Sequence, residues 1–183
     1  KHLGRKRVPY VFGSGDTGTV EYEVLEVTRP VISVGNLVAG GSGKTPIVHW
    51  LVGECLSLGH DPAIAMRGYG RSPHHYKSPM YMNMGGMSDE EAEYRRLLGE
   101  IQVISHPDRH AAVSAHLASH PEIDCLLLDD GFQHRQIHRD LDIVLVDASR
   151  PPAGDRLLPA GWLREPPSAL ARADAVILTH ADT

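Results

Sequence analysis

The sequence predicts an α/β fold, in which a mostly parallel β-sheet is flanked by helices. Short apolar runs of Val, Ile and Leu recur along the chain, and segments with the apolar spacing of helices lie between them. Strands that are apolar at every position are typical of parallel sheets, because helices cover both faces of such sheets. A glycine-rich loop separates the first apolar run from the first helical segment, and this order of strand, loop and helix begins the fold of phosphate-loop (P-loop) proteins.

The expected elements follow one another along the chain. Apolar runs predict strands over residues 31–34, 63–66, 102–104, 123–128, 143–146 and 175–178. Periodicity and start signals predict helices over residues 46–58, 88–98 and 107–119. Gly59 ends the first helix, and Ser88 with Glu91 forms a capping box at the start of the second. Residues 72–87 are predicted to form a surface loop, and residues 20–25 an edge strand or hairpin.

The composition is that of a globular domain with one core. The chain has 183 residues, of which 42% are hydrophobic and 22% are charged. A formal net charge of −5 argues against binding to nucleic acid, and the 12 scattered His show no zinc-site spacing. Cys55 and Cys125 lie in apolar segments, so we expect them to be reduced core residues of a cytosolic protein. The sequence contains no apolar run long enough to cross a bilayer and no signal peptide.

The glycine-rich loop has the composition of a phosphate-binding site. It reads NLVAGGSGKTP over residues 36–46. The residues expected to bind phosphate are Gly40, Gly41, Ser42, Gly43, Lys44 and Thr45. Lys44 is expected to bridge the β- and γ-phosphates of a nucleoside triphosphate, and Thr45 to hold Mg²⁺. Val38 departs from the usual pattern, which has glycine at that position.

Acidic residues at the ends of two predicted strands are candidates for the metal site. Asp129 and Asp130 follow a buried apolar run, where two adjacent acids need a cation such as Mg²⁺ to neutralise them. Asp147 follows the next run and is a weaker candidate, better explained as a strand-end turn acid. Asp89 could orient the hydroxyl that accepts a phosphoryl group, although the helix dipole alone also favours an acid in a first turn.

Several strings together resemble the tetraacyldisaccharide 4′-kinases of lipid A biosynthesis, which are P-loop kinases. The matching strings are SVGNL and GGSGKTP around the loop, RGYGR at 67–71, DE at 89–90, DR at 108–109, DDGFQH at 129–134, RD at 139–140 and RLLPAGWLREP at 156–166. They occur in the family's order and cover residues 31–180 or so. The resemblance also accounts for Val38, because the family's own loop lacks the first glycine.

The resemblance implies a kinase that transfers the γ-phosphate of ATP, with Mg²⁺, to the 4′-hydroxyl of the lipid A precursor tetraacyldisaccharide 1-phosphate. It implies a peripheral enzyme at the cytoplasmic face of the bacterial inner membrane, in contact with its anionic surface. Asp89 matches the catalytic base of the family. Residues implied on the metal and phosphate side are Asp129, Asp130 and His134, and those near the active site are Arg164 and Glu165. From their charge, we expect Arg67 and Arg71 to meet the lipid headgroup.

The resemblance also implies a division of the chain. Residues 1–29 would be the remnant of a membrane-proximal segment, with residues 1–7 in place of the family's membrane-contacting helix. Residues 30–183 would be the kinase core, without the family's C-terminal lobe. The chain lacks an initial Met and stops just after an apolar run, so we expect a fragment of a longer protein.

Two alternatives come from other classes. The loop also resembles the K-G-G-x-G-K-[ST] loop of dimeric switch ATPases and metal-insertion GTPases, and residues 179–182 approach the guanine-reading string [NT]-K-x-D. However, Ala39 replaces the first lysine of that loop, and His180 replaces the lysine that stacks on the base. A preference for GTP, or stimulation by dimerisation, would favour this class. A non-catalytic binding module would require Asp89 and Asp129 to be idle.

Overall fold

The computed structural model describes residues 2–11, 17–40, 43–68 and 89–181. Six strands form one parallel sheet in the order β5-β4-β6-β3-β7-β8. The strands are β3 (Val31–Asn36), β4 (Pro62–Arg67), β5 (Gln102–His106), β6 (Cys125–Asp129), β7 (Leu141–Asp147) and β8 (Ala175–Thr179). The helices are α1 (Lys44–Ser57), α3 (Asp89–Leu98), α4 (Arg109–Ser119) and the 3₁₀ helix η1 (Pro167–Arg172). The predicted α/β fold with a parallel sheet is confirmed.

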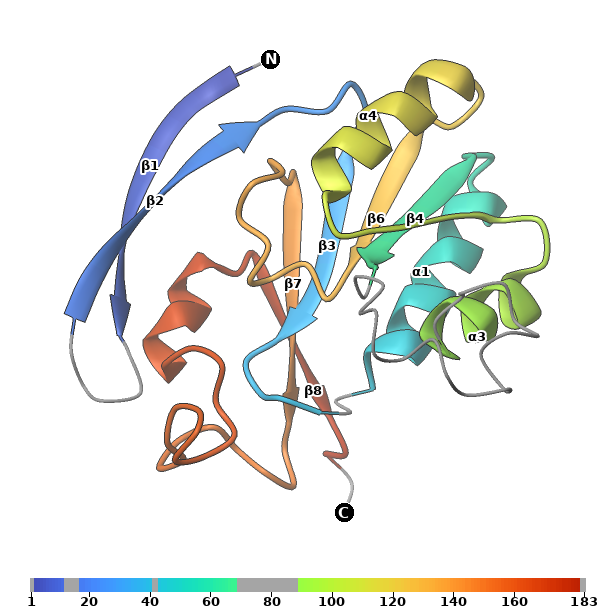
Figure 1. Cartoon of the computed structure of the whole chain (residues 1–183). Helices are drawn as coiled ribbons and strands as arrows, with labels where there is room; N and C mark the ends of the chain where they lie inside the picture. The colour runs from blue at the N-terminus through green and yellow to red at the C-terminus, as the bar shows by residue number, and fades with distance from the viewer. Residues whose placement is uncertain (1, 12–16, 41–42, 69–88, 182–183) are drawn as a thin grey trace, which may run out of the picture.

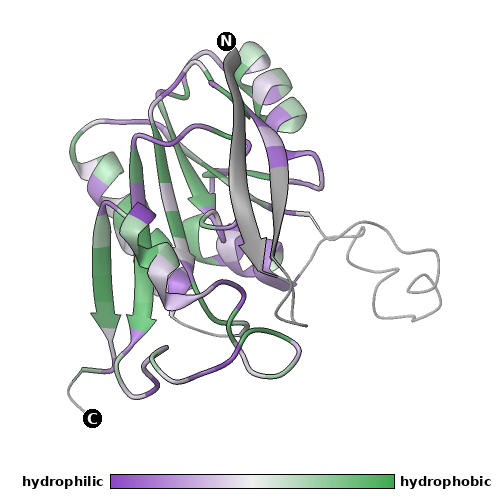
Figure 2. Ribbon diagram, turned by 90° about the vertical axis from the view of Figure 1, so that its left-hand side faces the viewer, coloured by the Kyte–Doolittle hydropathy of each residue, from purple (hydrophilic) through white to green (hydrophobic). Residues whose placement is uncertain are grey.

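Helices cover both faces of the sheet, as its apolar strands require (Figure 1). Alternate residues of one strand face opposite sides: Leu127 of β6 packs in the cluster that includes α1 and α3, whereas Leu126 and Leu128 pack in the cluster that includes α4. Apolar residues therefore follow one another along the central strands (Figure 2). Of the two cysteines, Cys125 is buried and Cys55 is half-buried, and both are free thiols.

The helices begin close to the predicted positions, for local reasons. Asp108 caps α4 by accepting a hydrogen bond of 3.0 Å from the backbone N–H of Ala111, so this helix starts at residue 109 rather than 107. Helix α3 carries three acids in its first turn and Arg95 and Arg96 in its last, which complements the helix dipole. Ser88, the first member of the predicted capping box, lies outside the described residues.

An antiparallel hairpin precedes the sheet. Strands β1 (His2–Val11) and β2 (Thr17–Leu25) pair with each other and extend away from the sheet (Figure 1), which confirms the predicted hairpin. Its base is held by backbone hydrogen bonds from Leu25 N–H to Gln136 C=O and from His138 N–H to Leu25 C=O, of 2.8 and 2.9 Å. Residues 2–7 belong to β1, so the described part of residues 1–7 is a strand and not a helix.

No helix in the described parts of the chain has the length and apolarity needed to span a bilayer. The expectation that residues 1–29 lie next to a membrane stays a prediction.

We expect opposite stability effects from alanine at two glycines. In β3, a Cβ on Gly35 would lie 2.5 Å from Cβ and 2.7 Å from the backbone nitrogen of Phe132, and backbone cannot move aside easily. Gly35→Ala should therefore lower the free energy of unfolding by about 3 kcal/mol, the upper end for overpacking. Gly53 of α1 has open space around its Cβ position, so Gly53→Ala should raise that free energy by roughly 0.5–1 kcal/mol. Urea unfolding measures both, and a neutral Gly35→Ala would show that Phe132 can shift.

Candidate active site

The phosphate loop lies at the carboxyl edge of the sheet, between β3 and α1. Gly40 (φ 112°) and Gly43 (φ 75°) have left-handed backbone conformations that favour glycine. Gly43 is the N-cap of α1, and no described side chain caps that helix. The first N–H groups of α1 are therefore open to an anion, whose charge the helix dipole also favours. Gly41 and Ser42 lie outside the described residues.

Val38 has a structural partner that explains the missing glycine. It forms an antiparallel bridge with Leu163. On either side, the N–H of Ala39 donates to the C=O of Trp162 at 2.8 Å, and the N–H of Arg164 donates to the C=O of Leu37 at 2.7 Å. The first half of the loop thus pairs as a short strand with residues 162–164, a conformation that suits a β-branched residue better than glycine.

Asp130 brings two cationic side chains together. Its Oδ1 lies 3.4 Å from Nζ of Lys44, and its Oδ2 accepts a hydrogen bond of 2.6 Å from Arg164. Although burial alone would raise the pKa of Asp130, the charges of Lys44 and Arg164 keep it below its ordinary value. Asp130 is therefore ionised near neutral pH. It holds the side chains of Lys44, from the phosphate loop, and Arg164, from the 156–166 segment, next to each other.

Asp129 is the buried member of the acidic pair. Asp129 is the last residue of β6, and its Oδ2 accepts a hydrogen bond of 3.1 Å from the hydroxyl of Tyr94. Burial raises the pKa of Asp129, against the opposing charge of Lys44. Tyr94 thus contacts Asp129, the predicted metal ligand at the end of β6.

Helix α3 brings Glu90 to the acidic pair. Burial, followed by the charges of Asp129 and Asp130, raises the pKa of Glu90. Asp89, the predicted base, is the exposed first residue of the same helix. Glu90 and Tyr94 were both missed as site residues. The acid next to Asp89 was a usable signal for Glu90, whereas Tyr94 reads as an ordinary core position of a helix.

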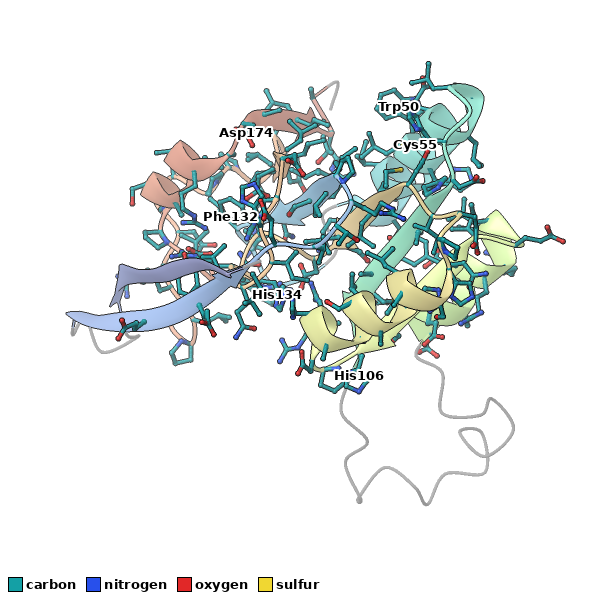
Figure 3. The ribbon with its side chains drawn as sticks, turned by 90° about the horizontal axis from the view of Figure 1, so that it is seen from above. Trp50, Cys55, His106, Phe132, His134 and Asp174 are labelled. Carbon is teal, nitrogen blue, oxygen red and sulfur yellow. The ribbon has the colours of Figure 1, made fainter. Side chains whose placement is uncertain are left out.

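His134 lies near two arginines, Arg109 at the start of α4 and Arg139 before β7. His134 follows β6 and is labelled in Figure 3. Burial, followed by the charges of Arg109 and Arg139, lowers the pKa of His134 to about 4. The ring is therefore neutral near pH 7, so His134 would act as a hydrogen-bonding group rather than as a cation for phosphate. Arg109 is itself buried, and its guanidinium donates to the C=O of Asp130 at 3.3 Å.

The residues predicted near the substrate divide into two groups. Arg164 contacts Asp130 as described, and Arg67 is exposed at the carboxyl end of β4. Glu165 forms ion pairs with Arg135 and Arg172, which hold the 156–166 segment against the segment after β6 and against η1. Contact of Glu165 with substrate stays a prediction. Arg71 lies outside the described residues, as does the loop at 72–87.

Asp147 takes the role of a turn acid. Its Oδ1 accepts hydrogen bonds from the backbone N–H and the hydroxyl of Ser149, at 2.9 and 2.6 Å. These are the local bonds of a residue that stabilises the turn after a strand, as its position at the end of β7 predicted.

The acidic pair fits a divalent cation. Oδ1 of Asp129 is buried without a hydrogen-bond partner, a costly state for a carboxylate oxygen, and Oδ1 of Asp130 beside it has its ion pair with Lys44. Mg²⁺ is usually held by one or two carboxylates together with substrate phosphates, rather than by a complete protein cage. The described residues contain no cluster of three or more His, Cys, Asp or Glu able to hold a metal alone.

These features together define an α/β protein of the P-loop class: a parallel sheet, a glycine loop that leads into a helix, and acidic residues at the end of a neighbouring strand. Comparison with known proteins identifies the family. The sequence profile described as LpxK, Tetraacyldisaccharide-1-P 4′-kinase, matches residues 17–183, so the chain belongs to this family. This membership decides against the dimeric switch class.

Named relatives agree with the profile. The chain is 39% identical over 181 residues to a tetraacyldisaccharide 4′-kinase of Pseudomonas putida (strain GB-1), and 40% identical over 166 residues to one of Geobacter metallireducens. These matches cover 97% and 87% of this chain but 51% and 48% of the relatives. A crystal structure of LpxK from Aquifex aeolicus in complex with ATP has a TM-score of 0.66 and 39% identity, and the match covers 87% of this chain and 51% of that one. The chain thus spans about half the length of these relatives.

Proposed function

We propose that this chain forms the nucleotide-binding part of a kinase that transfers the γ-phosphate of ATP to the 4′-hydroxyl of tetraacyldisaccharide 1-phosphate. One observation carries the proposal: the open start of α1, Lys44 and the acidic pair converge at one edge of the sheet. Two names support it, that of the Pseudomonas putida relative as a tetraacyldisaccharide 4′-kinase and that of the Aquifex aeolicus structure as a complex with ATP.

The cationic side chains would stabilise the transferred phosphoryl group. Phosphoryl transfer depends on positioning and on charges that are in place before the reaction. Asp130 already holds Lys44 and Arg164 together beside the phosphate loop, so little reorganisation is needed when the phosphate chain enters. Mg²⁺, when held by Thr45 and the acidic pair, would neutralise charge on the β- and γ-phosphates.

Asp89 would take the proton of the acceptor hydroxyl. A base for an incoming alcohol must be reachable from solvent and close to the phosphate site. Asp89 is exposed, and its neighbour Glu90 lies within the electrostatic reach of Lys44 and the acidic pair. This placement supports the first turn of α3 as the acceptor side of the site.

We also propose peripheral attachment to the cytoplasmic face of a bacterial inner membrane. A tetraacylated acceptor is lipid-soluble, so the enzyme must reach it at a bilayer surface. Arg67 is exposed at the carboxyl edge of the sheet, where a basic side chain can meet an anionic headgroup. The net charge of −5 argues against a role in binding nucleic acid.

The test is transfer of radiolabelled γ-phosphate from ATP to tetraacyldisaccharide 1-phosphate in mixed micelles. Because the chain spans about half of its relatives, the assay compares it alone with a chimera in which it replaces the matching half of the Pseudomonas putida relative. The chimera should label the acceptor, prefer ATP to GTP, and leave a 4′-deoxy acceptor unlabelled. Equal use of GTP, or labelling of the 4′-deoxy acceptor, would contradict the proposal.

A further inference from the structure

Tyr94 anchors helix α3 to the carboxyl edge of the sheet. It is the one buried residue of α3, with 1% of its surface exposed. Its ring packs in the apolar cluster that contains Val48 and Val52 of α1. Its hydroxyl extends beyond this cluster to Asp129. A buried hydroxyl in this position does more than pack, because phenylalanine would fill the same apolar space.

The hydrogen bond between Tyr94 and Asp129 has a defined direction. A phenol has one hydrogen to donate and lone pairs with which to accept. The hydrogen goes to Oδ2 of Asp129, at 3.1 Å, because an ionised carboxylate can only accept. This bond holds one oxygen of the carboxylate in place and leaves the other, Oδ1, without a bond from Tyr94.

This direction determines what remains for a ligand. Oδ2 of Asp129 is occupied, whereas its Oδ1 is buried without a partner. An ionised carboxylate oxygen can only accept, which suits a hard cation such as Mg²⁺.

We propose that Tyr94 is a positioning residue that orients the carboxylate of Asp129 so that its Oδ1 presents lone pairs to the Mg²⁺ of the bound nucleotide. This inference rests on the proposed function, since it requires a nucleotide bound with its metal. The same bond fixes α3, so it also sets the position of the first turn that carries Asp89. Tyr94 thereby links the metal side of the site to the acceptor side.

The test separates metal-dependent binding from binding in general. Calorimetry measures the affinity for ATP with excess Mg²⁺ and again with EDTA, for the wild-type chain and Tyr94→Phe. Loss of a group that orients metal ligands costs about tenfold or more in metal affinity. The increase in ATP affinity on adding Mg²⁺ should therefore be about tenfold smaller for Tyr94→Phe than for the wild type. In EDTA the two should bind ATP equally well. Tyr22→Phe, which removes the same hydroxyl from half-buried Tyr22 of the hairpin, should match the wild type in both conditions.

The outcomes are distinct. The inference would be overturned if Mg²⁺ raised the ATP affinity of Tyr94→Phe as much as it raises that of the wild type. An equal loss of ATP affinity with and without Mg²⁺ would also overturn it, because it would indicate a purely structural role. If Tyr94→Phe did not fold, Tyr94→Met would give the same comparison, because its flexible apolar side chain can fill the space without a hydroxyl. A wild-type chain that gained nothing from Mg²⁺ would instead contradict the proposed nucleotide chemistry.

Discussion

Replacing Lys44 with alanine is expected to weaken ATP binding by roughly ten- to a hundredfold, the value of one hydrogen bond to a charged group. Phosphoryl transfer should fall by a further factor of about a hundred or more, because fixed positive charge stabilises the transition state more than the ground state. The side chain lies 3.4 Å from Asp130 at the start of α1, beside the open N–H groups. Its loss also leaves Asp130 with Arg164 as its remaining ion-pair partner among the described residues.

Two measurements check this expectation. Calorimetry gives the affinity for ATP, and single-turnover transfer in the chimera gives the chemical step. His49→Ala provides the control, because His49 is an exposed residue of the same helix, one turn further from the loop. Lys44→Ala with unchanged affinity and unchanged transfer would remove the phosphate loop from the mechanism.

The sequence was sufficient for features that depend on local pattern. The central strands could be predicted because both of their faces are buried, which leaves uninterrupted apolar runs such as that before Asp129. The start of α1 could be predicted because a phosphate loop requires glycines followed by Lys44 and Thr45. In both cases, neighbours in the chain supply the information.

Contacts between distant segments could not be predicted in this way. Arg164 pairs with Asp130 across 34 positions, and Tyr94 bonds to Asp129 across 35. The three-dimensional fold places these segments at one edge of the sheet, and no periodicity of either segment indicates it. Glu165 shows the same limit: its position near the active site came from the resemblance, and its ion pairs with Arg135 and Arg172 could not be predicted from the sequence.

The segment at residues 156–166 connects the two halves of the site. Its backbone pairs with Leu37 and Ala39, which fixes the first half of the phosphate loop. Its Arg164 reaches Asp130, which fixes the loop's lysine from the other side. A change in this segment should therefore affect phosphate binding even where its own side chains contact no ligand.

Asp89→Asn is expected to reduce phosphoryl transfer by about 10²- to 10⁴-fold, the usual contribution of a general base. ATP affinity should stay within about threefold of the wild type, because the base acts on the acceptor and not on the nucleotide. Asparagine keeps the size and hydrogen-bonding capacity of the side chain but cannot take a proton. The first turn of α3 retains Glu90 and Glu91, so the dipole of the helix remains complemented.

Neighbouring acids provide the comparison that identifies the base. Glu93→Gln changes an exposed acid of the same helix and should leave both transfer and ATP affinity unchanged. Glu90→Gln tests the acid that lies near the acidic pair, and it should alter ATP affinity in the presence of Mg²⁺ because its charge acts on that pair. If Glu90→Gln abolished transfer at unchanged ATP affinity while Asp89→Asn did not, the base would be Glu90. The role assigned to Asp89 would then be wrong. A general base must lie within hydrogen-bond reach of the proton that it takes, so the result would place Glu90 rather than Asp89 beside the 4′-hydroxyl.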